Sequence, residues 1–164
     1  MKSLIILSGC CALLPAFAQH VHQVDAQRQA EVAARGREVM PFDLSATIHV
    51  FTKVRDGGTQ RVLAKNNADA PQVKLVRAHL RDIARQFRRG DFMAPAHIHG
   101  NDMPGLAELR KAEPGQLTIT YRDVPAGAEL GYQSRDPELV AALHRWFDAQ
   151  LSEHGADAAA GHHD

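Results

Sequence analysis

The strongest constraint on the fold is an Asp-Gly turn between two strand-like segments. Residues 44–54, LSATIHVFTKV, alternate in polarity and contain many β-branched and aromatic residues, and residues 59–65, TQRVLAK, continue the pattern after RDGG. Two such segments joined by Asp56-Gly57 are typical of a β-hairpin. We therefore expect an antiparallel strand pair, with the folded part of the chain starting near Phe42.

A long helix is predicted directly after this hairpin. Apolar residues recur at helical spacing between Val73 and Phe87, and Asp69 precedes them as a potential N-cap, with Pro71 in the first turn. Basic residues followed by Gly90 are typical of a helix end. The pattern predicts a helix over about 70–89, with ends uncertain by about 2 to 4 residues.

The second half of the chain repeats this order without repeating the residues. A loop is predicted over 91–105, then a short helix in PGLAELRKA, a hairpin in QLTITYRDV-PAGA-ELGYQS, and a helix from Asp136 to near Gly155. The order ββαββα predicts a single α+β domain over 42–155. We expect a four-stranded antiparallel sheet made of two hairpins, with the two main helices packed on one face.

The two ends of the chain differ from this domain in composition. Residues 1–18 combine Lys2, an apolar stretch and Ala16-Phe17-Ala18, the pattern of a signal peptide cleaved after Ala18. Export to the periplasm or secretion is expected, and a lipoprotein acylated at Cys10 is the alternative. Residues 19–41 are polar and rich in alanine, which predicts a flexible arm, and residues 156–164 predict a disordered tail containing histidines.

Composition narrows the chemistry that the exported part can carry. Both cysteines, Cys10 and Cys11, lie within the predicted signal peptide, so no thiolate ligand or disulfide is expected after cleavage. The formal net charge of zero argues against nucleic acid as a partner, and no later apolar segment is long enough to span a membrane. The sequence has no Gly-x-Ser-x-Gly or His-Glu-x-x-His pattern. All ten histidines lie after residue 18, so a metal site would use imidazole, thioether or carboxylate groups.

The segment DFMAPAHIHGNDMPG, residues 91–105, places two methionines symmetrically around a His-x-His pair. Met93 precedes His97 by four residues, and Met103 follows His99 by four. Imidazole suits copper and zinc, and thioether sulfur selects soft ions, above all Cu(I). A His-x-His pair in an extended segment points its rings to opposite sides, so both bind one ion only if the loop curls. The alternative is that Met93 fills the core next to Phe92, Met103 packs against the following short helix, and one histidine is simply solvated.

Four other histidines occupy positions that could bring them toward this segment. His79 and His144 each project about 80° from the centre of the apolar stripe of its predicted helix, at the edge of the buried face. His49 lies on the first strand, and His154 lies in the last turn of the second main helix. The alternative for each is a partly buried imidazole bonded to a carbonyl.

These patterns predict an exported transition-metal-binding protein for copper storage, delivery or tolerance, with zinc as the second choice of metal. Its partners would be the metal ion and possible proteins that exchange metal with it. One alternative is a small enzyme with a histidine-bound metal that activates water and Asp102 as a base. Another is a metal-free module that binds a small molecule or a protein. The candidate ligands are His79, His97, His99, Met103 and His144, with His49 and His154 in reserve.

Three segments also resemble a known group of proteins. TIHVFTKVRDGGTQ, the RAHLR…GDF…IHGNDMPGL block and LVAALHRWFDAQLSEHGAD are similar to short exported bacterial proteins of unassigned function, sometimes labelled aspartate carbamoyltransferase. The chain is too short for a two-domain transferase and lacks the Ser-Thr-Arg-Thr phosphate loop of those enzymes. The resemblance therefore implies a compact exported domain and no particular reaction.

Overall fold

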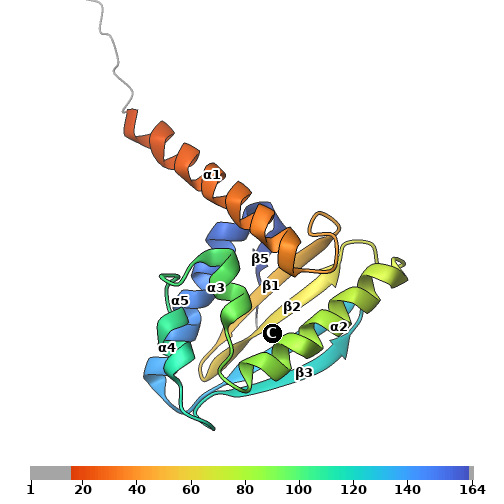
Figure 1. Cartoon of the computed structure of the whole chain (residues 1–164), viewed down its shortest axis with the longest axis vertical. Coiled ribbons are helices and arrows are strands. Elements are labelled where there is room, and N and C mark those ends of the chain that lie inside the picture. Colours follow the sequence, from red (N-terminus) through yellow and green to blue (C-terminus); the bar gives the residue numbers. More distant parts are fainter. Residues whose placement is uncertain (1–15, 163–164) are drawn as a thin grey trace, which may run out of the picture.

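The computed structural model describes residues 16–162, which form an α+β fold around one mixed sheet (Figure 1). In chain order the elements are α1 (Ala16–Val39), β1 (Thr47–Val54), β2 (Gly57–Ala64), α2 (Ala70–Phe87), α3 (Met93–His99), α4 (Leu106–Lys111), β3 (Thr118–Val124), β4 (Gly127–Gln133), α5 (Pro137–His154), a 3-10 turn (Gly155–Asp157) and β5 (Ala158–Ala160).

Both predicted hairpins are present in the sheet, whose strand order is β3-β4-β2-β1-β5. β1 pairs antiparallel with β2, and Val54 lies opposite Gly57 across the predicted Asp-Gly turn. β3 pairs antiparallel with β4, and Val124 lies opposite Gly127. β2 joins the two hairpins by pairing antiparallel with β4.

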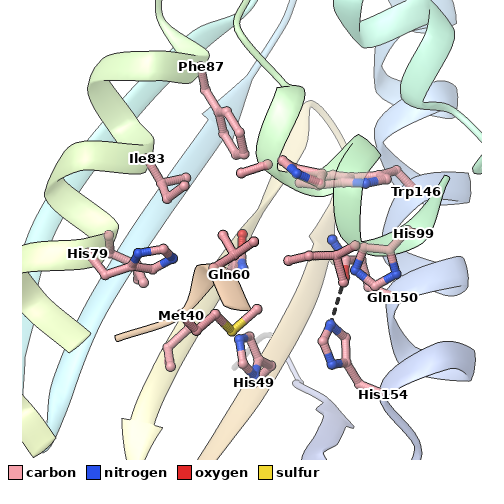
Figure 2. Close-up of a pocket in the computed structure, with 16 residues that line it drawn as sticks. Met40, His49, Gln60, His79, Ile83, Phe87, His99, Trp146, Gln150 and His154 are labelled. Carbon is pink, nitrogen blue, oxygen red and sulfur yellow. Dashed lines mark hydrogen bonds between the residues drawn. The ribbon is translucent and has the colours of Figure 1, made fainter. Parts of the chain in front are cut away.

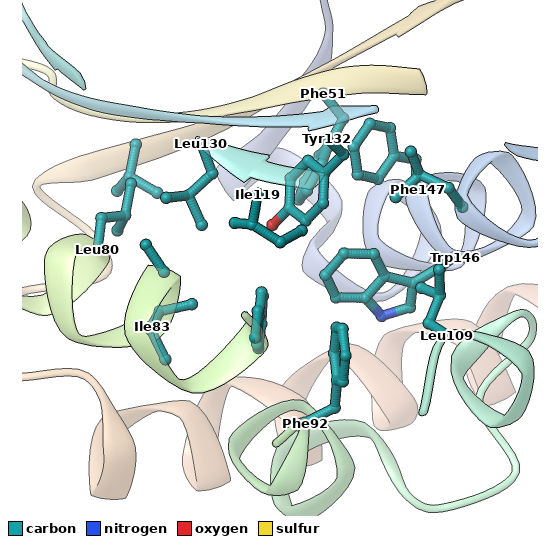
Figure 3. Packing of buried hydrophobic residues seen from close by; sticks show 14 of the residues in the cluster. Phe51, Leu80, Ile83, Phe92, Leu109, Ile119, Leu130, Tyr132, Trp146 and Phe147 are labelled. Atoms are coloured by element: carbon teal, nitrogen blue, oxygen red, sulfur yellow. The ribbon is translucent and has the colours of Figure 1, made fainter. Parts of the chain in front are cut away.

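The two main helices also begin where their caps predict, and both pack on the same face of the sheet. Asp69 Oδ1 accepts a hydrogen bond from Gln72 N at the start of α2, and Asp136 Oδ1 accepts one from Glu138 N at the start of α5. Figure 3 shows the core beneath the sheet, with strand side chains meeting those of α2 and α5. Phe147 of α5, for example, packs on Phe51 of β1 with ring centroids 5.1 Å apart.

The sheet differs from the prediction by one added strand. β5 pairs parallel with β1, with Ala158 opposite His49, so the sheet is five-stranded and mixed rather than four-stranded and antiparallel. The predicted disordered tail over 156–164 is therefore wrong for residues 156–160. Three alanines carry no periodicity that indicates a strand, and their pairing comes from the free edge of β1. His163 lies outside the described residues.

Two further segments are helical where a flexible arm and a loop were predicted. The arm predicted over 19–41 is helix α1 as far as Val39, and the loop predicted over 91–105 contains helix α3. The sequence of α1 has almost no hydrophobic stripe, although Val32 and Gly36, one turn apart, are buried. Contacts with α3 and α5 hold it in place.

The predicted signal peptide falls mainly outside the described residues, because the structure describes nothing before residue 16. Cleavage after Ala18 and the alternative of acylation at Cys10 therefore stay predictions. Within residues 16–162, no helix combines the length and apolar character needed to cross a membrane.

A glycine makes the contact between α4 and α5 possible. Gly105 precedes α4 with φ +80°, and a Cβ atom there would lie 2.0 Å from the carbonyl oxygen of Ala142. Gly115 has a similar φ of +89°, but nothing lies within 4 Å of the corresponding position. The two glycines thus share a backbone conformation and differ in the space around them.

We predict that Gly115→Ala lowers the free energy of unfolding by about 1–2 kcal/mol, the cost of a left-handed alanine. Gly105→Ala should lower it by at least about 2 kcal/mol more, because α4 must also move away from α5. Urea denaturation of both variants measures the difference. Equal losses would contradict this account of the α4–α5 contact.

Candidate functional site

A small cavity lies between the sheet and the helices, and four histidines line it. His49 comes from β1, His79 from α2, His99 from α3 and His154 from the end of α5 (Figure 2). The space open to the centres of water-sized molecules is about 50 Å³, which is room for a few waters or a single ion. Other polar or sulfur-containing side chains on the wall are Met40, Gln60, Trp146 and Gln150.

The predicted histidines thus converge in part. His79 and His99 were primary candidates and His49 and His154 were reserves, and the structure brings these four to one cavity. α5 packs on the sheet, with Phe147 against Phe51 of β1, and its end brings His154 beside His49. The chain leaves α5 at His154 and returns so that Ala158 pairs with His49.

Three other primary candidates lie elsewhere. Met103 is 3% exposed and packs in the hydrophobic core, the place that the alternative interpretation gave to Met93, which is exposed. His144 Nε2 donates to the carbonyl oxygens of Val54 and Gly57, at 3.1 and 2.8 Å, and so braces the first hairpin turn. His97 is exposed on the outer side of α3. Asp102, the predicted base, does not line the cavity.

His99 is held in a fixed orientation by a carboxylate. Its Nδ1 donates to Glu153 Oε2 at 2.6 Å, and its side chain is only 2% exposed. Glu153 also accepts hydrogen bonds from Arg28 Nε and Nη2, at 3.0 and 2.9 Å. Burial by itself raises the pKa of Glu153, but the hydrogen bonds from His99 and Arg28 outweigh it and lower the pKa below its ordinary value. His99 is therefore anchored through Nδ1, and its Nε2 is left for a ligand.

Helix α1 fastens the helix that carries His99. Arg28 Nη2 donates to the carbonyl oxygen of His99, and Arg35 Nε donates to that of Ile98 at 2.6 Å. These carbonyls belong to the last turn of α3, where a helix lacks internal partners. α1 thus caps the C-terminal end of α3. Val39 and Met40, which follow Arg35 at the end of α1, line the cavity.

The ring of His154 lies next to the rings of both His49 and His99. Its ring centroid is 4.9 Å from that of His49, with planes 11° apart, and 5.1 Å from that of His99, with planes 72° apart. His154 Nε2 is 3.0 Å from Gln150 Oε1, one turn earlier on α5. On another wall, His79 packs edge-on against Phe42, with centroids 5.5 Å apart.

Burial keeps several of these imidazoles neutral. It is the main cause that lowers the pKa of His154 to about 4, with the nearby His99 adding to the effect. Burial also lowers the pKa of His79 and lowers that of His49 well below 6.5. At pH 7 these three rings therefore present lone pairs rather than charge to their surroundings.

Two buried polar atoms on the cavity wall have no hydrogen-bond partner among the described residues. They are Nδ1 of His49 and Nε1 of Trp146. A buried polar atom left unpaired costs about 1–3 kcal/mol, so such atoms often mark a position that a ligand or a water completes. The sequence offered no sign of Trp146, because its spacing on α5 is also that of an ordinary core residue.

The cavity does not hold a ready-made metal shell. Among residues 16–162, no three His, Cys, Asp or Glu side chains are arranged to bind one ion. The stacked rings of His49 and His154 give one physical reason. A metal lies in the plane of each imidazole that binds it, and two nearly parallel, stacked planes share no such point. One ring would have to rotate before both could bind the same ion.

Sequence reasoning missed the residues that build the site around the histidines. Arg28, Val32 and Arg35 lie on one face of α1 at i, i+4 and i+7, a spacing that a search for a mixed polar and apolar face could have detected. Met40 and Glu153 had no comparable signal. Their roles depend on which elements pack beside them.

The fold and cavity define this chain as an α+β protein with a small, histidine-lined cavity. Comparison with protein-family models, curated proteins and solved structures finds no match.

We predict that stability falls in mild acid because a neutral ring is favoured in the fold. His154 has a pKa of about 4 in the folded chain against 6.5 when unfolded. Its contribution is present above pH 6.5 and is lost as pH falls toward 4, because the unfolded chain then binds more protons. His154 alone should account for about 1–2 kcal/mol between pH 7 and pH 5.

Urea denaturation of the native chain and of His154→Gln at both pH values tests this. The variant should lose less stability over the same pH interval, since it lacks the titrating ring. An identical pH dependence in both proteins would show that burial of His154 does not oppose its protonation.

Proposed function

We propose that the cavity binds a soft transition-metal ion, with copper as the first choice and zinc as the second, through His49, His99 and His154 with help from Met40. The observation that carries the proposal is the unpaired, buried Nδ1 of His49, whose ring stacks on His154, which in turn packs edge-on against His99. Imidazole nitrogen and thioether sulfur are ligands that copper accepts together.

The electrostatics of the cavity favour a cation over an anion. No Lys, Arg, Asp or Glu is among the described residues that line it. Imidazole binds metal in its neutral form, and burial holds His49 and His154 in that form at neutral pH. Lone pairs in a buried cavity attract a positive ion, whereas an anion would find no positive side chain on the wall.

The His99–Glu153 pair has the arrangement common around metal-bound histidines. Such a histidine usually donates its second ring nitrogen to a carboxylate or a carbonyl, which fixes the ring and raises its basicity. His99 does this through Nδ1 at 2.6 Å. Its Nε2 is then the ligand atom of a ring that needs no reorientation.

Binding by all three rings requires His154 to turn away from the plane of His49. In turning, His154 gives up its hydrogen bond to Gln150 and its stacking on the ring of His49. A site that closes by rotation of a ring can also release its ion by the reverse rotation. This favours storage, delivery or tolerance over catalysis, in the periplasm if the leader is removed as expected.

A second candidate function is binding of a small, uncharged polar molecule without metal. Trp146 Nε1 favours it, because an unpaired N–H needs an acceptor that a bare cation does not provide. The limited volume restricts such a molecule to a few non-hydrogen atoms.

We predict that Ag(I), a diamagnetic substitute for Cu(I), shifts the NMR signal of the Met40 methyl group. In protein labelled with carbon-13 at the methionine methyls, the Met103 signal serves as an internal control, because Met103 lies in the core away from the cavity. The Met40 signal should move until one equivalent of Ag(I) is bound at this site, and the Met103 signal should stay in place.

Two histidine variants distinguish binding in the cavity from binding by a histidine outside it. His99→Ala should weaken the Ag(I) affinity reported by Met40 by at least about tenfold. His97→Ala removes an imidazole from the same helix but from its exposed side, and should leave that affinity unchanged. A Met40 signal that does not respond to excess Ag(I) would refute metal binding in this cavity. Binding of a small polar molecule would then be the remaining candidate function.

A further inference from the structure

The outer face of α3 carries a second group of potential soft-metal ligands, outside the cavity. Met93 and His97 are four residues apart in the helix, a spacing that puts their side chains on the same face. Both are exposed, and Met93 at 62% is the most exposed large apolar residue among those the structure describes. Burial therefore gives no reason for a methionine at this position.

His97 has the same kind of partner as His99. Its Nε2 donates to Glu38 Oε2 at 3.1 Å, just as His99 Nδ1 donates to Glu153. In each case a carboxylate orients the ring and leaves the other ring nitrogen for a ligand. For His97 that nitrogen is Nδ1, on a side chain 54% exposed to solvent.

This surface group spans the two elements that cover one side of the cavity. Glu38 directly precedes Val39 and Met40, which line the cavity from the end of α1. Met93 directly precedes Ala94 and Pro95, which line it from α3. An ion held at the surface group would therefore lie on the outer side of the wall formed by α1 and α3.

We propose that Met93 and His97, with Glu38 as a positioning residue, form a surface site that captures a soft monovalent metal ion and passes it into the cavity. This inference rests on the proposed function of the cavity. The ligands are the sulfur of Met93 and Nδ1 of His97, a thioether and an imidazole of the kind that select Cu(I). The path runs between the end of α1 and α3, which both line the cavity.

Methionine NMR in the His99→Ala background tests capture separately from the cavity, with Ag(I) as the probe. The Met93 methyl signal should shift on addition of Ag(I), and His97→Ala in the same background should abolish the shift at equal metal concentration. Glu38→Gln should weaken the affinity by about tenfold, the effect expected for a carboxylate that orients a ligand. Glu31→Gln, an exposed residue of the same helix, is the matched control and should change nothing.

Stopped-flow fluorescence tests the passage of the ion. Trp146 is the single tryptophan of the chain and lines the cavity, so its emission reports arrival of Ag(I) there. In an otherwise native chain, the double variant Met93→Ala/His97→Ala should slow this signal by about tenfold or more while leaving its final amplitude unchanged, because the cavity ligands are intact.

The outcomes distinguish the two proposals. A Met93 signal that ignores Ag(I), or a loading rate unaffected by the double variant, would overturn the surface site and its role. A responding Met93 with a silent Met40 would instead refute the metal function of the cavity. If neither the Met93 nor the Met40 signal responds to Ag(I), both proposals are refuted. Met93 is then simply an exposed methionine, and His97 and Glu38 form a structural pair.

Discussion

The arrangement of the cavity depends on the hydrogen bonds made by Glu153. This side chain lies near the end of α5 and accepts from Arg28 of α1 and His99 of α3, so three elements distant in sequence meet at one carboxylate. A largely buried carboxylate is stable only when its oxygens are well paired, and here both are. Without this group, α1 would lose its main polar contact with α5, and the ring of His99 would be free to turn.

The consequences extend from this carboxylate to the wall of the cavity. Arg28 and Arg35 bond to the last carbonyls of α3, so α1 cannot move without exposing the end of that helix. Met40 and Val39 reach the cavity because they follow α1 directly. The thioether proposed as a copper ligand is therefore positioned by arginines several residues earlier in the chain.

The helical conformation of α3 gives the two histidines of the His-x-His pair different surroundings. Residues two apart in a helix point about 200° apart, so α3 turns His99 inward and His97 outward. Each ring donates to a glutamate, one on α5 and one on α1. His99 thus lines the cavity, whereas His97 lies on the exposed face of the same helix.

The sequence alone determined the elements whose signals are local. The Asp-Gly turn, the capping residues Asp69 and Asp136 and the apolar spacing of α2 and α5 all predicted their structures, because each depends on neighbours within a few residues. Periodicity also indicated that His79 lies at the edge of a buried face, where the structure places it. The α+β class followed from these elements.

Only the tertiary structure decided which histidines share a cavity. His49 meets His154 because α5 packs on the sheet, with Phe147 against Phe51. β5 then pairs with an otherwise free strand edge, and three alanines carry no pattern that predicts this pairing. α1 is ordered through arginines that bind the end of another helix, an interaction invisible to hydrophobic periodicity. Local patterns record what each segment prefers by itself, whereas the positions of these rings depend on contacts between segments that are far apart in the chain.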